Sequence, residues 1–176
     1  YDGVGEAYGF DPETASEDEI RRIAAEEGLD TEGQEVGHLL VELFDKRVAP
    51  TLINPTFVID YPESTSPLTK KHRTKPGLVE RFECYVDGME VMNCYTELND
   101  PRKQRANFEA ELRRRSAGYE EAMLMDEDFV IAMEYGMPPM GGIGISIDRF
   151  TMIFTNAEHI REVILFPTMK PRTKQI

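Results

Sequence analysis

Residues 141–150 read Gly-Gly-Ile-Gly-Ile-Ser-Ile-Asp-Arg-Phe, the most informative pattern in the chain. Gly142 and Gly144 alternate with Ile143, Ile145 and Ile147, which predicts a strand that packs on its isoleucine face and is bare on the other. A flat ligand fits on the bare face. The apolar residues that follow suit a helix beginning near Asp148, so Arg149 falls in its first turn beside free backbone N–H groups. Such a position attracts an anion, and phosphate is the best candidate.

The same stretch also fits a simpler interpretation: a buried strand with a glycine bulge, and a helix whose arginine pairs with a carboxylate. It is not the dinucleotide-binding pattern Gly-x-Gly-x-x-Gly, because Ile147 stands in place of the third glycine. The phosphate-binding loop Gly-x-x-x-x-Gly-Lys-[Ser/Thr] is also absent from the sequence. A nucleotide site here is therefore a hypothesis that depends on the rest of the chain.

The composition excludes several classes of protein. The chain has 176 residues, of which 40% are hydrophobic, enough for one core or for one core with an appendage. Its formal charge of −13 argues against general nucleic-acid affinity, because phosphate backbones are bound by an excess of lysine and arginine. Residues 69–75 and 170–174 are the candidates for a local basic patch that could contact RNA. We favour a simpler interpretation, in which the first run is a solvated loop and the second a frayed terminus.

Cysteine and histidine usage predicts a reduced, cytoplasmic protein. Cys84 and Cys94 are too few for a disulfide framework or a zinc site, and the three histidines lack metal-ligand spacing. The sequence contains neither a signal peptide nor an apolar run long enough to span a membrane, so no membrane partner is expected. Because the chain begins at Tyr1 rather than at methionine, we expect it to be a piece of a longer protein.

Helical spacing of apolar residues dominates the first fifty residues. A capping box at Ser16 to Glu19 begins a short amphipathic helix that Gly28 ends. A second helix is predicted from Gln34 to Val48, before Pro50. Residues 1–12 are glycine-rich and acidic, and no element is assigned to them.

From Pro55 onward the pattern changes to strands. A strand is predicted over residues 56–62, and a short extended piece begins at Ser66. Residues 78–86 and 89–95 flank Asp87-Gly88, the strongest hairpin signal in the sequence. Two further helices are predicted, and each begins at an aspartate cap: residues 100–117 and 126–136.

Two glutamates of the predicted hairpin fall on one face. With a two-residue Asp87-Gly88 turn, Tyr85 pairs with Glu90, so Glu83 and Glu90 are diagonal neighbours. Two carboxylates this close repel unless a cation lies between them. Mg²⁺ suits that place, because it favours one or two carboxylates together with phosphate oxygens. The alternative is a pair of solvated glutamates on an open sheet face.

Beyond the hairpin turn, Asn93, Tyr95 and Glu97 alternate onto a single face. An amide, an aromatic wall and a carboxylate suit an amino acid with a cationic side chain. Glu97 can pair with an ammonium group, and Tyr95 can cover the methylene stem. Strict alternation places Glu90 on the opposite face, so a single site requires a β-bulge near residues 91–92.

These features together resemble the class II aminoacyl-tRNA synthetases, whose motif 3 is a glycine-alternating strand running into Asp-Arg at a helix start. The usual motif carries glycine where this chain has Ser146, a departure that alters the fit under the nucleotide. Within that class the chain is similar to the lysyl-tRNA synthetase family from Pro55 to its end. The similarity rests on segments in the family's order: Pro55-Thr56-Phe57, Tyr61-Pro62, Ser66-Pro67-Leu68, Gly77 to Glu83, Tyr95 to Asp100, Glu134 to Pro139 and Leu165 to Pro171.

The resemblance implies an α+β fold: an antiparallel sheet of the class II aminoacyl-tRNA synthetase type with flanking helices, incomplete in this chain. Residues 1–50 would be a helical insertion or lead-in segment, and residues 51–176 the C-terminal part of the catalytic domain. Roles carry over by position: ATP binding by Glu83, Glu90, Gly142, Gly144 and Arg149, with Arg149 as the catalytic contact to the γ-phosphate; magnesium binding by Glu83 and Glu90; and lysine binding by Asn93, Tyr95 and Glu97.

Motif 1, motif 2 and the OB-fold that reads the anticodon do not precede Pro55 in this sequence. The resemblance therefore implies a fragment of a lysine–tRNA ligase, weakly active or inactive alone. The parent enzyme, a homodimer, converts lysine and ATP to lysyl-adenylate and transfers lysine to tRNA(Lys). Two alternatives stay open: a paralogue that attaches lysine to a protein, and a non-catalytic module that binds ATP or lysine.

Overall fold

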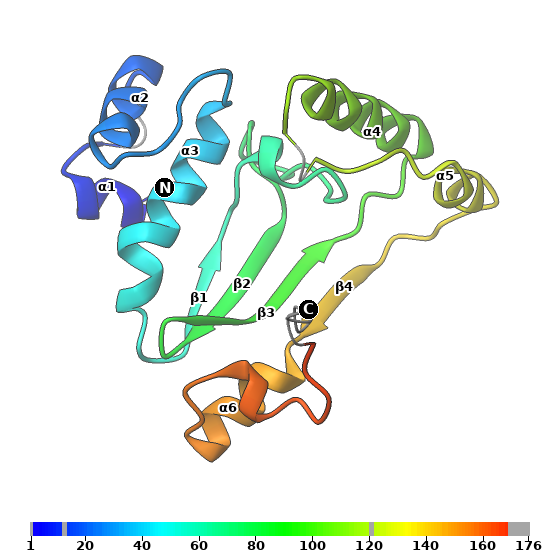
Figure 1. Cartoon of the computed structure of the whole chain (residues 1–176). Helices are drawn as coiled ribbons and strands as arrows, with labels where there is room; N and C mark the ends of the chain where they lie inside the picture. Colours follow the sequence, from blue (N-terminus) through cyan, green and yellow to red (C-terminus); the bar gives the residue numbers. More distant parts are fainter. Residues whose placement is uncertain (1, 12–13, 120–121, 169–176) are drawn as a thin grey trace, which may run out of the picture. The chain divides into compact units, whose positions relative to one another are not determined.

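The computed structural model of the chain describes residues 2–11, 14–119 and 122–168. Contacts divide the chain into two compact units, residues 1–144 and 145–176. The first unit is built on a sheet of strand order β1-β2-β3-β4, with helices beside it (Figure 1). The expected α+β class with an antiparallel sheet is confirmed, because β1 pairs with β2, and β2 with β3, in antiparallel register.

Most elements lie where the sequence predicts them. The strands are β1 (Thr56–Ile59), β2 (Arg81–Val86), β3 (Met89–Thr96) and β4 (Gly141–Ile145). The helices are α1 (Asp2–Tyr8), α2 (Glu17–Glu26), α3 (Val36–Leu43), α4 (Pro101–Ser116), α5 (Glu127–Glu134) and α6 (Ile147–Thr155). A π-helical turn (Phe44–Val48) extends α3, and short 3₁₀ turns occupy Ala49–Thr51, Glu63–Thr65 and Ile160–Glu162.

Helix α1 lies in the segment to which the sequence assigns no element. Its two glycines lower the intrinsic helix propensity, so pattern alone does not reveal it. Packing compensates, because Val4 is buried in the core. The carbonyl of Gly5 ends the helix by accepting the N–H groups of Gly9 and Phe10. Tertiary burial therefore outweighs local preference here.

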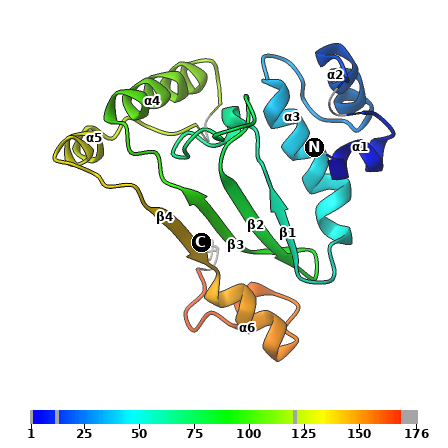
Figure 2. The same ribbon diagram turned by 180° about the vertical axis from the view of Figure 1, so that it is seen from behind.

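The core of the first unit lies between helices α1 to α3 and the end of the sheet that β1 and β2 form (Figure 2). Leu39 and Leu43 of α3 are fully buried. Phe44 packs edge-on against Tyr85 of β2, with 5.5 Å between the ring centroids. The helical lead-in thus shares one core with the hairpin, and a domain boundary at residue 50 stays a prediction.

The hairpin has the predicted turn. Asp87 and Gly88 both have left-handed backbone, with φ of 54° and 71°, as a two-residue turn of this type requires. Tyr85 pairs with Glu90 as expected, but Cys84 pairs with Met92, so one residue of β3 is left over between them. The bulge that a single site requires near residues 91–92 is confirmed.

Two predicted strand boundaries are wrong. Strand β1 ends at Ile59 rather than near residue 62, because Asp60 has a φ of 62° and left-handed backbone does not continue a ladder. Residues 78–80 do not belong to the hairpin strand, which begins at Arg81. Leu78 and Val79 form isolated bridges, with Pro62 and Lys71 respectively. The extended piece expected after Ser66 forms isolated bridges too, because Thr69 pairs with Glu97 and Lys71 with Val79.

The loop of residues 62–68 connects the helices to the sheet. Gly37 of α3 contacts this loop so closely that a Cβ there would lie 2.8 Å from Pro62 Cβ. From the other side, Gln104 Nε2 and Asn107 Nδ2 of α4 both donate to the Pro67 carbonyl, at 3.2 and 2.7 Å. The loop is therefore fixed by two helices that are distant in sequence.

The glycine-rich strand departs from its prediction in one respect. Ile143 of β4 is 63% exposed, so the expectation that its isoleucine face is packed is wrong for the described part of the chain. The strand is also shorter than predicted, because Ile147 is already the first residue of α6.

Among the described residues, no helix combines the length and the apolar character that crossing a membrane requires.

The second unit contains α6 and the 3₁₀ turn after it. The Ser146 hydroxyl accepts the N–H of Arg149 at 3.3 Å, so the serine that departs from the usual motif caps the helix. Asn156 ends the helix with left-handed backbone, φ 53°, and the N–H of Ala157 bonds to the Met152 carbonyl. Arg149 lies in the first turn, as predicted.

Candidate active site

Because of the bulge in β3, the predicted polar residues of the hairpin lie on one face of the sheet. Glu83 lies opposite Asn93, and Tyr85 lies opposite Glu90. Directly opposed residues share a face, and so do residues two apart on one strand. Glu83, Glu90, Asn93 and Tyr95 therefore face the same side, which strict alternation without the bulge would forbid.

Glu97 is the next polar residue along this edge, and its backbone is fixed on both sides. Its N–H donates to the Met140 carbonyl at 3.0 Å, and Thr69 pairs with it on the other side. Burial raises the pKa of the Glu97 carboxyl above its ordinary value. Among the described residues no hydrogen-bond donor or cation contacts this carboxylate, so a cationic group could still pair with it.

The glycine strand contacts the same carboxylate. A Cβ built on Gly142 would overlap with Glu97 Oε1, so the missing side chain gives this carboxylate its room. At Gly144 a Cβ would lie 3.5 Å from the Asn93 carbonyl, which is ordinary contact. The structure thus places Gly142 next to the predicted lysine site. The role of Gly142 and Gly144 beneath an adenine stays a prediction.

Tyr95 provides a wall beside Glu97. Burial raises the pKa of the Tyr95 phenol, the Glu97 carboxylate raises it further, and Arg81 opposes this rise. The two side chains therefore lie close enough to interact electrostatically. An aromatic ring next to a partly dehydrated carboxylate suits an aliphatic stem that ends in an ammonium group.

Glu83 is held more tightly than its predicted metal-binding role requires. The carboxylate is 6% exposed, and its Oε2 accepts the hydroxyls of Tyr61 at 2.6 Å and Tyr85 at 2.8 Å. Its Oε1 accepts from the Arg81 guanidinium. Burial and the carboxylate raise the pKa of both phenols. Of roughly four lone pairs, one on Oε1 is left for a cation.

A third carboxyl group, Asp45, was not predicted to belong to this region. It lies in the π-helical turn after α3, and such turns are frequent at functional sites. Burial, followed by the charges of Glu83 and Glu90, raises the pKa of Asp45 to about 6. In the described parts of the chain, no three His, Cys, Asp or Glu side chains lie close enough together to hold a metal ion. Magnesium binding by Glu83 and Glu90 therefore stays a prediction.

Sequence reasoning also missed Tyr61 and Arg81. Arg81 carries a recognisable signal, since it lies two residues before Glu83 and so faces the same side of β2. Tyr61 carries none, because its contact with Glu83 joins residues 22 apart in the chain.

Arg149 belongs to the other compact unit, so its sharing of a site with Glu97 stays a prediction.

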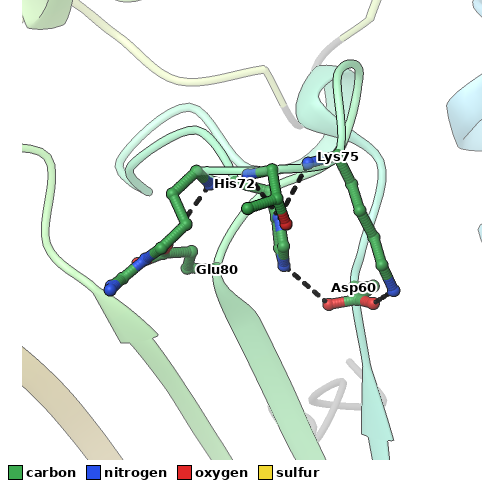
Figure 3. A network of polar contacts seen from close by, with 6 residues as sticks. Asp60, His72, Lys75 and Glu80 are labelled. Atoms are coloured by element: carbon green, nitrogen blue, oxygen red, sulfur yellow. Dashed lines mark hydrogen bonds and ion pairs between the residues drawn. The ribbon is translucent and has the colours of Figure 1, made fainter.

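The basic run at residues 69–75 is largely neutralised (Figure 3). Lys75 pairs with Asp60, and His72 Nε2 lies 3.5 Å from the same carboxylate. His72 Nδ1 accepts the N–H of Lys75 at 3.0 Å. Arg73 binds Glu80 through two nitrogens and lowers the pKa of that carboxyl to about 2. A self-paired loop is thus favoured over an RNA contact, whereas the second basic run, residues 170–174, lies outside the described residues.

Comparison with known proteins identifies the class to which this fold and site belong. Residues 8–170 match the family model of the tRNA synthetases class II (D, K and N), so the chain belongs to that family.

Within the family, the curated relatives that it resembles are lysine–tRNA ligases. The chain is 47% identical over 173 residues to the enzyme of Moorella thermoacetica, and 49% identical to those of Saccharolobus solfataricus and Bacillus subtilis. These alignments cover 97%, 98% and 97% of the chain and 35% of each relative. The chain thus spans about a third of the length of the relatives it matches.

Proposed function

We propose that the chain is the lysine-recognising part of a lysyl-tRNA synthetase, which forms lysyl-adenylate from lysine and ATP and transfers lysine to tRNA(Lys). One observation carries the proposal. The backbone of Glu97 is fixed by hydrogen bonds, and its carboxylate is partly dehydrated. This carboxylate has no cationic partner among the described residues. The ammonium group of a lysine substrate supplies that partner. The similarity to lysine–tRNA ligases supports the same substrate.

The site residues bind and orient rather than react. Glu97 pairs with the substrate ammonium, Tyr95 covers the methylene stem, and Asn93 donates to an acceptor on the ligand. A carboxylate oxygen of lysine then attacks the α-phosphorus of ATP, and the bond to the leaving pyrophosphate breaks. No protein nucleophile takes part, so positioning and charge neutralisation provide the catalysis.

Two carboxylates are available to bind magnesium in this proposal. Glu83 and Glu90 would hold the ion, with Glu83 using its remaining Oε1 lone pair. A bound Mg²⁺ neutralises phosphate charge during the displacement. Arg149, in the first turn of α6, is proposed to contact the γ-phosphate, where its cation and the helix N-terminus both favour an anion.

Calorimetry on the 176-residue chain tests this function. We expect it to bind lysine more tightly than norleucine, which has the same stem without the ammonium group. We expect ATP–pyrophosphate exchange to be far slower than in an intact lysine–tRNA ligase, because motif 2 is not in this sequence. Equal affinity for lysine and norleucine would refute lysine recognition. Exchange at the rate of an intact enzyme would refute the expectation of an incomplete site.

A second function keeps the same pocket but changes the acceptor. A paralogue that attaches lysine to a protein has no need to hold tRNA, and the formal charge of −13 and the self-paired basic loop favour this alternative. Assays of the longer protein separate the two functions. One arm measures transfer of lysine to tRNA(Lys), and the other measures transfer of lysine to lysine residues of a protein. Charging of tRNA(Lys) alone would exclude the paralogue.

A further inference from the structure

The Arg81 guanidinium contacts both parts of the proposed site. Its Nε donates to Asn93 Oδ1 at 3.1 Å, in the lysine-binding set. Its Nη2 donates to Glu83 Oε1, in the set proposed for ATP and magnesium. Its Nη1 donates to Ser66 Oγ at 3.0 Å. One side chain, itself 17% exposed, therefore joins the two sets.

Few other side chains could make this arrangement. Arg81 Cζ lies 4.6 Å from the Tyr61 ring centroid, so the planar group is stacked as well as hydrogen-bonded. All three guanidinium nitrogens have a named acceptor. A lysine at this position would bring one compact ammonium group and could keep the charge pair with Glu83, but it could not span all three acceptors.

The contact with Asn93 determines what this amide offers to a ligand. An asparagine that is free to rotate presents either its carbonyl oxygen or its NH₂ group. Here Oδ1 already accepts from Arg81, so the amide orientation is fixed and Nδ2 is the group left to donate. Asn93 is thereby set to recognise a hydrogen-bond acceptor on the ligand.

We propose that Arg81 is the positioning residue of the lysine site, and that it acts through Asn93 without contacting the substrate. The proposal rests on the proposed function for the identity of the ligand. Its structural part, the fixed Asn93 amide, does not depend on that function. Arg81 therefore sets lysine affinity by keeping one amide in its donating orientation.

A double-mutant cycle in the 176-residue chain tests the coupling. We expect Arg81→Lys to weaken lysine binding about tenfold, the effect of losing one hydrogen bond near a charged group. In the Asn93→Ala background the same substitution should change affinity less than about twofold, because the group through which Arg81 acts is gone. Equal losses in both backgrounds would show a general structural role and overturn the proposal. Ser66→Ala, which removes only the third contact, is the matched control and should retain affinity.

A second measurement needs no lysine. Side-chain NMR relaxation of the Asn93 NH₂ group should show a rigid amide in the wild type, with an order parameter of roughly 0.85, and a value below roughly 0.6 in Arg81→Lys. An equally mobile amide in both proteins contradicts the proposal. If the amide is rigid and Arg81→Lys releases it while the wild type binds no lysine, then the positioning stands and the proposed function fails.

Discussion

Glu97→Gln provides the sharpest test of the proposed site, because it removes a charge and hardly changes the shape. The carboxylate is partly dehydrated and has no cationic partner in the described part of the chain. In the lysine complex it would form the central ion pair. Removing one partner of a buried charge pair costs about 2 to 5 kcal/mol, and the partial exposure of Glu97 favours the lower end, about 2 kcal/mol. That corresponds to roughly a 30-fold loss of lysine affinity.

The same substitution should stabilise the chain in the absence of ligand. Burial raises the pKa of Glu97 above its ordinary 4.5, which means that the fold disfavours the charged form. Wild-type stability therefore falls as the pH rises from 4.5 through the raised pKa, and the cost is fully present above that raised pKa. Glutamine does not carry this cost, so Glu97→Gln should melt at a higher temperature than the wild type at pH 7 and show no advantage in acid.

Calorimetry with lysine and with ATP, together with melting curves at several pH values, measures both effects. ATP affinity should be unchanged, because Glu97 belongs to the proposed lysine-binding set. Glu109→Gln, an exposed position on α4, is the matched control and should alter neither quantity. Equal loss of lysine and ATP binding, or a lower melting temperature at pH 7, would mean that Glu97 is a structural residue and that the reasoning is wrong.

Three further substitutions test the neighbouring contacts. Gly142→Ala should displace the Glu97 carboxylate and lower lysine affinity while the chain still folds, because the displaced atom ends a flexible side chain; unchanged affinity in calorimetry would contradict the contact. Tyr85→Phe removes one hydroxyl donor from buried Glu83 and should cost about 1 to 3 kcal/mol in urea unfolding at pH 7; no loss would show that the bond contributes nothing. Asp45→Asn should stabilise the chain above pH 6, where the carboxyl of raised pKa is charged, and this gain should disappear as the pH falls toward 3.8. A gain that is independent of pH in the same unfolding assay would rule out the electrostatic explanation.

Local signals in the sequence predicted the elements that depend on a few neighbouring residues. The Asp87-Gly88 turn is one, because left-handed backbone at two successive positions demands such residues. The helix caps Ser16, Asp100 and Asp126 are others, since each side chain accepts an N–H two or three residues later. Helix α1 was missed because its stability comes from burial rather than from propensity.

Only the part of the candidate site that follows from the alternation of side chains along one strand was predicted. Asn93, Tyr95 and Glu97 followed from period-two spacing, whereas their common face with Glu90 required a bulge near residues 91–92, which alternation alone does not produce. The end of β1 at Asp60 was missed for a related reason, since an aspartate in left-handed backbone has no distinct sequence signal.

The order of elements, the hairpin turn, the helix caps and the family could all be predicted from the residues alone, because these features depend on neighbouring residues and on long, specific matches. Three contacts could be read only from the folded chain: Tyr61 donates to Glu83, Arg81 fixes Asn93, and Gly142 makes room for Glu97. These contacts join residues that lie far apart in the chain or on different strands. They exist only once strand register and burial are established, and the spacing of residues along one segment does not encode either.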